Sequence, residues 1–206
     1  EGLSIIQVNT DGVTVKLPRH KLTEYETICA AWQKQVGLEL EYAYYSKMII
    51  RDVNNYIALY TNGKVKRKGA YQYEDLGWHQ DQGGLVIPKA AEAFMLHGVD
   101  IEDYIKGHQN NYDFLLRTKV PRNSRLVMVM LDGSEVQQQN ICRYYASTAG
   151  GDLVKIMPPL EVDGEERRMD VGSGWKMWVC NNIKDFDRRD VDYQFYIDAA
   201  RKLVVQ

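Results

Sequence analysis

The stretch LSIIQVNTDGVTVK, residues 3–16, decides how the first part of this 206-residue chain folds. Residues 4–8 and 13–16 are rich in β-branched side chains, which favour half-buried strands. Between them lies NTDG, residues 9–12, and an Asp-Gly pair in this place is a strong signal for a hairpin turn with positive φ. The pattern predicts a β-hairpin that holds the Asp11 carboxylate at its tip.

Asp11 is a candidate metal ligand, because a stiff hairpin presents its carboxylate clear of bulky neighbours. Asp-Gly turns are also common where no ligand binds, since Asp bonds to its own backbone and tolerates turn conformations. The hairpin by itself is therefore compatible with a metal ligand and with an ordinary turn. The choice between them depends on the later segments of the chain.

Composition is that of a globular protein, with 45% hydrophobic and 26% charged residues and a net charge of −2. The length suits one large domain or two small ones. No apolar run approaches the roughly 20 residues that cross a bilayer, no signal peptide opens the chain, and three scattered cysteines predict neither disulfides nor a zinc site. We expect no membrane partner and a reducing, cytoplasmic setting. Because Glu1 and not Met comes first, we also expect a piece of something longer.

The first part of the chain predicts a helix packed on an antiparallel sheet, which is an α+β arrangement. A capping box begins the helix at Thr23, and Gly37 ends it. The predicted strands after the helix are residues 38–42, 46–52, 54–60 and 64–71, with a hairpin turn at Asn62-Gly63 between the last two.

The character of the sequence changes near residues 80–86, which predicts domains of residues 1–83 and 84–206. In the second part Pro88 is expected to begin a helix that ends at Gly98, and Asp100 to cap another. Residues 112–119 suit a helix or a strand equally. The remaining predictions are a buried strand at 126–131, a turn at Gly150-Gly151, an exposed loop at 161–168 and an amphipathic helix at 193–203.

Basic residues gather in two places despite the slightly negative net charge. The two clusters are Lys64, Lys66, Arg67 and Lys68, and Arg117, Lys119, Arg122 and Arg125. Local clusters of this kind can neutralise phosphates. On a strand, alternation would place Lys64, Lys66 and Lys68 on one face and Arg67 on the other. The alternative is an exposed edge strand that lysines protect from aggregation.

The order of these features resembles the palm of family B DNA polymerases, especially the phage-type ones. That family presents an aspartate on a hairpin of the pattern Y-x-D-T-D-S, where this chain has QVNTDG at residues 7–12, with Asp11 at the essential second aspartate. The family's K-K-x-Y and G-K-x-x-x-K-G motifs correspond to VNNY at 53–56 and GKVKRKG at 63–69. RYY at 143–145 and DYQFYI at 192–197 resemble phage polymerase thumb sequence.

The chain also departs from the family pattern. Asn9 replaces the first aspartate of the hairpin, Gly12 replaces its serine, and Val53 and Asn54 replace the lysines of the primer motif. Two upstream motifs are absent from these 206 residues: the strand with the other metal-binding aspartate, and the helix that receives the incoming nucleotide.

The resemblance implies the C-terminal part of a palm at 1–83 and a thumb at 84–206 of a DNA-directed DNA polymerase, or one subunit of a split one. The chemistry would be template-directed nucleotidyl transfer with two Mg²⁺ ions. Asp11 would be the catalytic, metal-binding carboxylate, and the missing part would supply the other and bind the dNTP. A set of polar and basic residues would hold primer-template DNA: Asn55, Tyr56, Lys64, Lys66, Arg67, Lys68, Arg122 and Arg125.

A chain with half of a metal site is expected to be inactive alone. A bacteriophage source would place it in the host-cell cytoplasm. The first alternative is a non-catalytic DNA-binding module derived from a polymerase, in which Asp11 is only a turn residue. The second, a phage structural protein, has only the general α+β composition in its favour.

Overall fold

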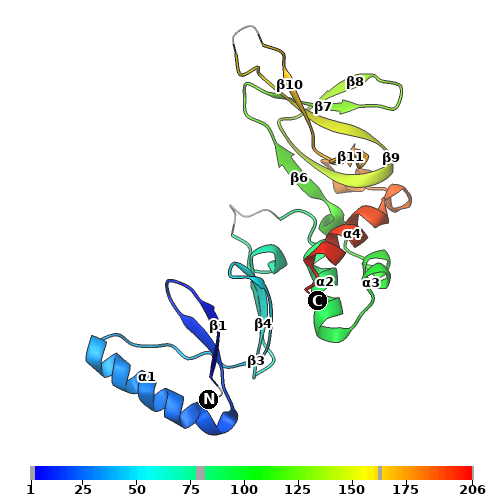
Figure 1. Ribbon diagram of the computed structural model, residues 1–206. Coiled ribbons are helices and arrows are strands. Elements are labelled where there is room, and N and C mark those ends of the chain that lie inside the picture. Colours follow the sequence, from blue (N-terminus) through cyan, green and yellow to red (C-terminus); the bar gives the residue numbers. More distant parts are fainter. Residues whose placement is uncertain (1–2, 78–81, 162–163, 206) are drawn as a thin grey trace. The chain divides into compact units, whose positions relative to one another are not determined.

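The computed structural model describes residues 3–77, 82–161 and 164–205, and it divides into two compact units (Figure 1). Unit 1 is Glu1–Gly69 and unit 2 is Ala70–Gln206. All strand pairs are antiparallel and helices accompany them in both units, which confirms the α+β class. The boundary expected after residue 83 differs from this division, and the assignment of palm and thumb stays a prediction.

The described residues of unit 1 form one hairpin, one α-helix preceded by a 3-10 turn, and one three-stranded sheet. Its elements are β1 (Ser4–Val8), β2 (Val13–Lys16), α1 (Leu22–Val36), β3 (Tyr45–Asp52), β4 (Asn55–Tyr60) and β5 (Val65–Lys68). β1 pairs with β2, and the other sheet has the order β3-β4-β5. The hairpin of residues 3–16, the end of the helix at Gly37 and the turn at Asn62-Gly63 are confirmed.

The turn at the tip of the hairpin differs from the predicted one, because Gly12 does not adopt positive φ. A four-residue loop joins the strands, and the Asn9 N–H donates to the Gly12 carbonyl at 3.0 Å. The Asn9 side chain accepts from the Asp11 N–H, also at 3.0 Å. Asn9 therefore supports the loop with its amide oxygen, and left-handed residues are not needed.

Three other predictions for unit 1 are wrong. Thr23 does not cap α1, because a 3-10 turn at Arg19–Lys21 leads directly into a helix that begins at Leu22. Residues 38–42 form no strand, and there the Leu40 N–H bonds to the Gln33 side chain of α1. The strand predicted at 64–71 is shorter, because β5 ends at Lys68 and a 3-10 turn comes next.

Unit 1 buries few apolar side chains. Among its described residues, Tyr56, Ile57 and Ala58 of β4 are the buried hydrophobic ones, and α1 contains none. Ile5 of β1 is 64% exposed and Ile28 of α1 is 61% exposed. The hydrophobic periodicity correctly predicts the helix. The apolar side chains of α1 are nevertheless not buried by the described residues of unit 1.

The described residues of unit 2 form three α-helices that pack on one another, with α4 (Tyr193–Leu203) against β9 (Ile141–Met157), and sheets built around this long strand. The other α-helices and strands of unit 2 are α2 (Val86–His97), α3 (Ile101–Gly107), β6 (Leu116–Lys119), β7 (Arg125–Val129), β8 (Glu135–Gln138), β10 (Arg167–Asp170) and β11 (Met177–Val179). The first half of β9 pairs with β6 and β11, and the second half with β7 and β10. The hydroxyl of Tyr196 on α4 accepts from the Ala146 N–H and donates to the Phe114 carbonyl, in the centre of the core.

The turn predicted at Gly150-Gly151 is wrong, because both glycines lie inside the continuous strand β9. A Cβ on Gly150 would lie 2.3 Å from the Met177 carbonyl oxygen, and one on Gly151 would lie 2.2 Å from that of Val129. The glycines therefore let neighbouring backbones approach β9 closely, where the strand passes from one set of partners to the other.

The other predictions for unit 2 have mixed outcomes. The strand near residues 126–131, the helix at 193–203, the Gly98 end of α2 and the Asp100 cap of α3 are confirmed. Pro88 is the third residue of α2 and not its first. Residues 112–119 contain both alternatives, a 3-10 turn at Asn111–Phe114 and then β6. The loop predicted at 161–168 is shorter because β10 begins at Arg167, and residues 162–163 lie outside the described residues.

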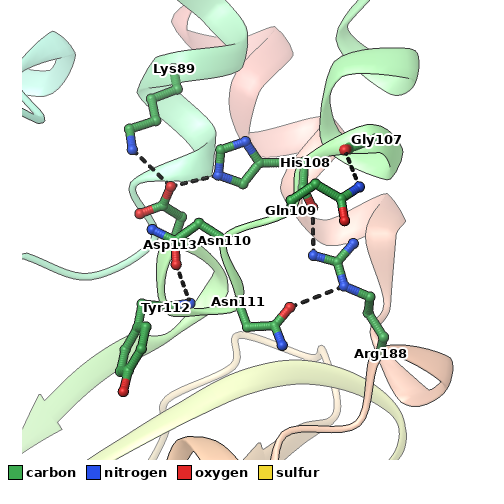
Figure 2. A network of polar contacts seen from close by, with 9 residues as sticks. All are labelled: Lys89, Gly107, His108, Gln109, Asn110, Asn111, Tyr112, Asp113 and Arg188. Carbon is green, nitrogen blue, oxygen red and sulfur yellow. Dashed lines mark hydrogen bonds and ion pairs between the residues drawn. The ribbon is translucent and has the colours of Figure 1, made fainter.

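A buried carboxylate joins α2 to the segment after α3 (Figure 2). The Asp113 side chain accepts from Lys89 Nζ at 2.7 Å and lies 2.5 Å from His108 Nε2. Arg188 donates to the His108 carbonyl and, at 3.0 Å, to the side chain of Asn111. The network thereby connects α2, the Asn111–Phe114 turn and the segment before α4.

None of the helices in the described ranges is long and apolar enough to cross a membrane. Cys29, Cys142 and Cys180 are free thiols. Burial raises the pKa of Cys142 to about 11, so this thiol stays protonated and unreactive at neutral pH.

Removing the Asp113 charge tests the network. Asp113→Asn should lower the free energy of unfolding by about 2–3 kcal/mol, because it leaves the Lys89 ammonium without its carboxylate in a largely buried place. Asp103→Asn, on the exposed side of α3, should change it by less than about 0.5 kcal/mol. Urea unfolding of both variants measures the difference, and equal effects would show that the network does not stabilise unit 2.

Gly151→Ala should destabilise the protein by about 1–3 kcal/mol, because its Cβ overlaps the Val129 carbonyl and β7 must move. Gly107→Ala is the matched control, since a Cβ there has no neighbour within 4 Å. Thermal unfolding followed by circular dichroism compares the two. A Gly151→Ala protein as stable as the control would contradict the close approach of the strands.

Candidate nucleic-acid and metal-binding cleft

A cleft of about 320 Å³ lies within unit 1, between the β-hairpin and the three-stranded sheet. Its lining comes from both strands of the hairpin, from the hairpin loop, and from β4 and β5. The lining residues are Gln7, Asn9, Asp11, Gly12, Val13, Thr14, Tyr56, Lys66 and Lys68. One carboxylate and two ammonium groups therefore share the cleft.

The hairpin is joined to the sheet through the turn between β3 and β4. The Gln7 side-chain amide donates to the Val53 carbonyl at 2.9 Å. Within that turn the Asp52 carboxylate accepts from the Asn55 side chain at 2.8 Å and from the Asn54 N–H at 2.9 Å. These hydrogen bonds, that of Asn55 first, hold the pKa of Asp52 below its ordinary value, so the turn carries a fixed negative charge at neutral pH.

Gly69 packs the end of β5 against the same turn. Its φ is +62°, and a Cβ there would lie 2.3 Å from both the Asn54 carbonyl oxygen and the Asn55 side-chain oxygen. Gly63, at the other end of the GKVKRKG stretch, has φ +86° in the turn between β4 and β5. The backbone therefore requires glycine at both positions, since each has positive φ. This explains why a glycine stands at each end of the GKVKRKG stretch.

Lys66 and Lys68 face the cleft because of the register of β5 on β4. Lys68 lies opposite Tyr56, and Lys66 lies opposite Ala58, so all four share one face of the sheet. Burial favours the neutral amine of Lys66, but the tyrosine hydroxyls around it outweigh that effect and raise its pKa above the ordinary value. Lys66 is therefore cationic at neutral pH.

The structure brings together Asp11, Tyr56, Lys66 and Lys68 of the predicted site residues. Others that the sequence grouped with them are absent from the lining of this cleft. Lys64 precedes β5 and is exposed, and Arg67 lies opposite the buried Ile57 on the other face, as the alternation predicted. Asn55 supports the turn through Asp52.

The two predicted DNA-binding arginines of the second part belong to unit 2. Arg122 is exposed within a turn in which the Ser124 N–H donates to the Pro121 carbonyl. Arg125 begins β7 and pairs with Glu166 at 2.8 Å, with both side chains about half exposed. An ion pair this exposed is weak, so Arg125 could exchange Glu166 for another anion.

The sequence predicts no site role for three of the polar lining residues: Gln7, Asn9 and Thr14. By sequence, Asn9 is only the residue that replaces the family's first aspartate. Strand alternation could have found two of them, because Gln7 pairs with Thr14 across the hairpin. The role of Gln7 depends on its bond to Val53, far away in sequence, for which no local pattern exists.

The lining offers a metal ion one anionic ligand. Mg²⁺ needs near-octahedral oxygen coordination, usually with one or two carboxylates plus substrate phosphates. Asp11 is the only carboxylate in the lining as far as the structure describes the chain, and the Asn9 side-chain oxygen already accepts from the Asp11 N–H. No described His, Cys, Asp and Glu residues form a group of three that could hold a metal. The described residues by themselves do not complete an Mg²⁺ site.

The cleft is suited to binding a phosphate-bearing ligand. Two lysines can neutralise phosphate oxygens, while the largely buried Tyr56 contributes only a small part of its side chain to the lining. A scan of the sequence against protein-family models matches no family, and a search of curated proteins gives no matching relative.

Proposed function

We propose that the chain is part of a DNA-directed DNA polymerase and that the cleft of unit 1 holds the primer-template near the site of nucleotidyl transfer. The observation that carries the proposal is the convergence of Asp11, Lys66 and Lys68 on one cleft. The sequence resemblance predicts the same three residues, in the same order along the chain, for that function.

Lys66 and Lys68 would bind the sugar-phosphate backbone of the DNA. Contacts of this kind position nucleic acid without reading its sequence. The Tyr56 side chain lies beside Lys68 on the cleft face and would contact the primer strand there. The network of Gln7, Val53 and Gly69 would keep the hairpin and β5 at a constant separation while DNA binds.

Asp11 would supply one ligand to the Mg²⁺ ions, which stabilise the attacking and leaving oxygens in this chemistry when bound. A single carboxylate leaves the metal site incomplete, so we propose that another part of the polymerase supplies the second. That part would also bind the dNTP. The small number of buried apolar side chains in unit 1 supports this, because its exposed β1 and α1 side chains would pack against the added part.

A non-catalytic DNA-binding module is the second candidate. The observation that favours it is that, among the described residues, Asp11 is the only carboxylate lining the cleft. In this case the lysines bind DNA in the same way, and Asp11 only closes the hairpin loop. The two functions differ in their need for Asp11.

Primer extension tests the catalytic proposal. With Mg²⁺ and dNTPs, the 206-residue chain should not extend a primer, and it should do so when joined to the polypeptide encoded upstream of Glu1. Asp11→Asn should lower the rate of the joined protein at least about 100-fold, because metal ions supply several kcal/mol of transition-state stabilisation.

Asp132→Asn is the matched control for Asp11, because Asp132 is also an exposed aspartate of an Asp-Gly hairpin turn. It should leave extension unchanged. Extension by the 206-residue chain alone would contradict the incomplete metal site. Equal rates for Asp11→Asn and the unaltered joined protein would favour the non-catalytic module.

Charge reversal at Lys66 and Lys68 tests DNA binding by the cleft. The double variant K66E/K68E should weaken binding about equally for all sequences and flatten the salt dependence by about 0.9 per lost phosphate contact. Fluorescence anisotropy with duplexes of several sequences, at a series of salt concentrations, measures both effects.

The variant K16E/K34E changes the net charge equally at exposed lysines outside the cleft and should bind nearly as the unaltered protein does. If the two double variants lose the same affinity, general charge and not the cleft explains binding. An unchanged salt slope in K66E/K68E would show that the two lysines do not contact the DNA phosphates.

A further inference from the structure

Two arginines of unit 2 lie directly opposite each other on neighbouring strands. β6 pairs with β9 so that Arg117 faces Arg143, and the next pair on the same side is Lys119 with Ile141. Cβ atoms of directly opposite residues are about 4.5–5.5 Å apart, and like charges in such positions destabilise a sheet. The pair is therefore an unfavourable choice for stability alone.

The β6–β9 ladder has one buried and one exposed face. On the buried face lie Thr118, Cys142 and Tyr144, which are 6%, 2% and 7% exposed. On the other face Arg117 and Lys119 are exposed and Arg143 is half-buried. The three cations consequently share a solvent-facing surface, and the opposite face of the same ladder is buried in the core.

Carboxylates do not neutralise this surface within the described ranges. The ion pairs among the described residues of unit 2 involve other lysines and arginines, namely Lys89, Lys106, Arg125, Arg168, Lys176 and Arg189. The charged groups of Arg117, Lys119 and Arg143 make no ion pair with a described carboxylate. An anion placed between Arg117 and Arg143 would convert their repulsion into two attractive contacts.

We propose that Arg117, Lys119 and Arg143 form a second surface for the sugar-phosphate backbone of a nucleic acid. Side chains two apart on a strand are about 6.6–6.8 Å apart, so the cations form a short row and not a single-ion pocket. Two of the three are arginines, whose planar guanidinium groups bind phosphate oxygens bidentately. A row of cations on a firm ladder suits a linear polyanion better than a compact ion.

This surface lies in unit 2 and does not depend on the cleft of unit 1. The test therefore uses the full chain with K66E/K68E already in place, so that binding by the cleft is removed. In this background R117Q/R143Q should reduce affinity about tenfold at low salt for both single-stranded oligothymidine and a mixed-sequence duplex. The salt slope should flatten by about 0.7–0.9 per lost contact.

The variant R201Q/K202Q is the matched control, because it removes two exposed positive charges from the end of α4. It should retain the affinity of the background protein. A second readout separates binding from structure: since R117Q/R143Q removes a repulsion, its urea midpoint should equal or exceed that of the background.

Unchanged affinity of R117Q/R143Q would overturn the proposal, and so would an equal loss in the control. A lowered urea midpoint would make the arginines structural and would overturn it as well. Binding to phosphatidylserine-containing vesicles in place of oligonucleotides would assign the surface to a membrane instead. Each of these outcomes concerns the surface of unit 2 only. None of them changes the result expected from the primer-extension test of Asp11.

Discussion

The contact between Gly69 and the Asn54 carbonyl is the constraint on which the cleft depends. Any side chain at residue 69 would collide with that backbone, so only glycine fits directly after the end of β5. The turn that receives Gly69 also accepts the Gln7 side chain through Val53. The hairpin bearing Asp11 and the strand bearing the lysines are therefore attached to one short segment, the hairpin by the Gln7 side chain and the strand by the close approach of Gly69.

Glycines also permit a close approach of neighbouring backbones in unit 2. Gly150 and Gly151 let neighbouring backbones approach the middle of β9, and this strand then serves two sets of partners along its 17 residues. A single strand so used brings side chains of the helices, β7 and β11 into one core, in which Tyr196 makes two hydrogen bonds. Glycine inside a strand costs stability by itself, and here the close packing explains its presence.

Local patterns predict the elements of this fold well and their contacts less well. The hairpin of residues 3–16, the glycine ends of α1 and α2 and the Asp100 cap all depend on neighbours in sequence. The turn prediction fails at Gly150-Gly151 because the reason for those glycines is a backbone far away in sequence. In the cleft, strand alternation is enough to place Lys66 and Lys68 together, whereas the bond from Gln7 to Val53 has no local signal. Arg143 cannot be recognised from sequence as a neighbour of Arg117, because register is a tertiary property.

The exposed apolar side chains of β1 and α1 have a thermodynamic consequence. If the added part proposed above covers these side chains, unit 1 gains stability from that contact through mass action. Its melting temperature would then rise with the concentration of that binding partner, and folding and assembly would be one process. In the cell, the abundance of the chain would follow that of its partner, because uncovered copies would be the ones that chaperones and proteases remove.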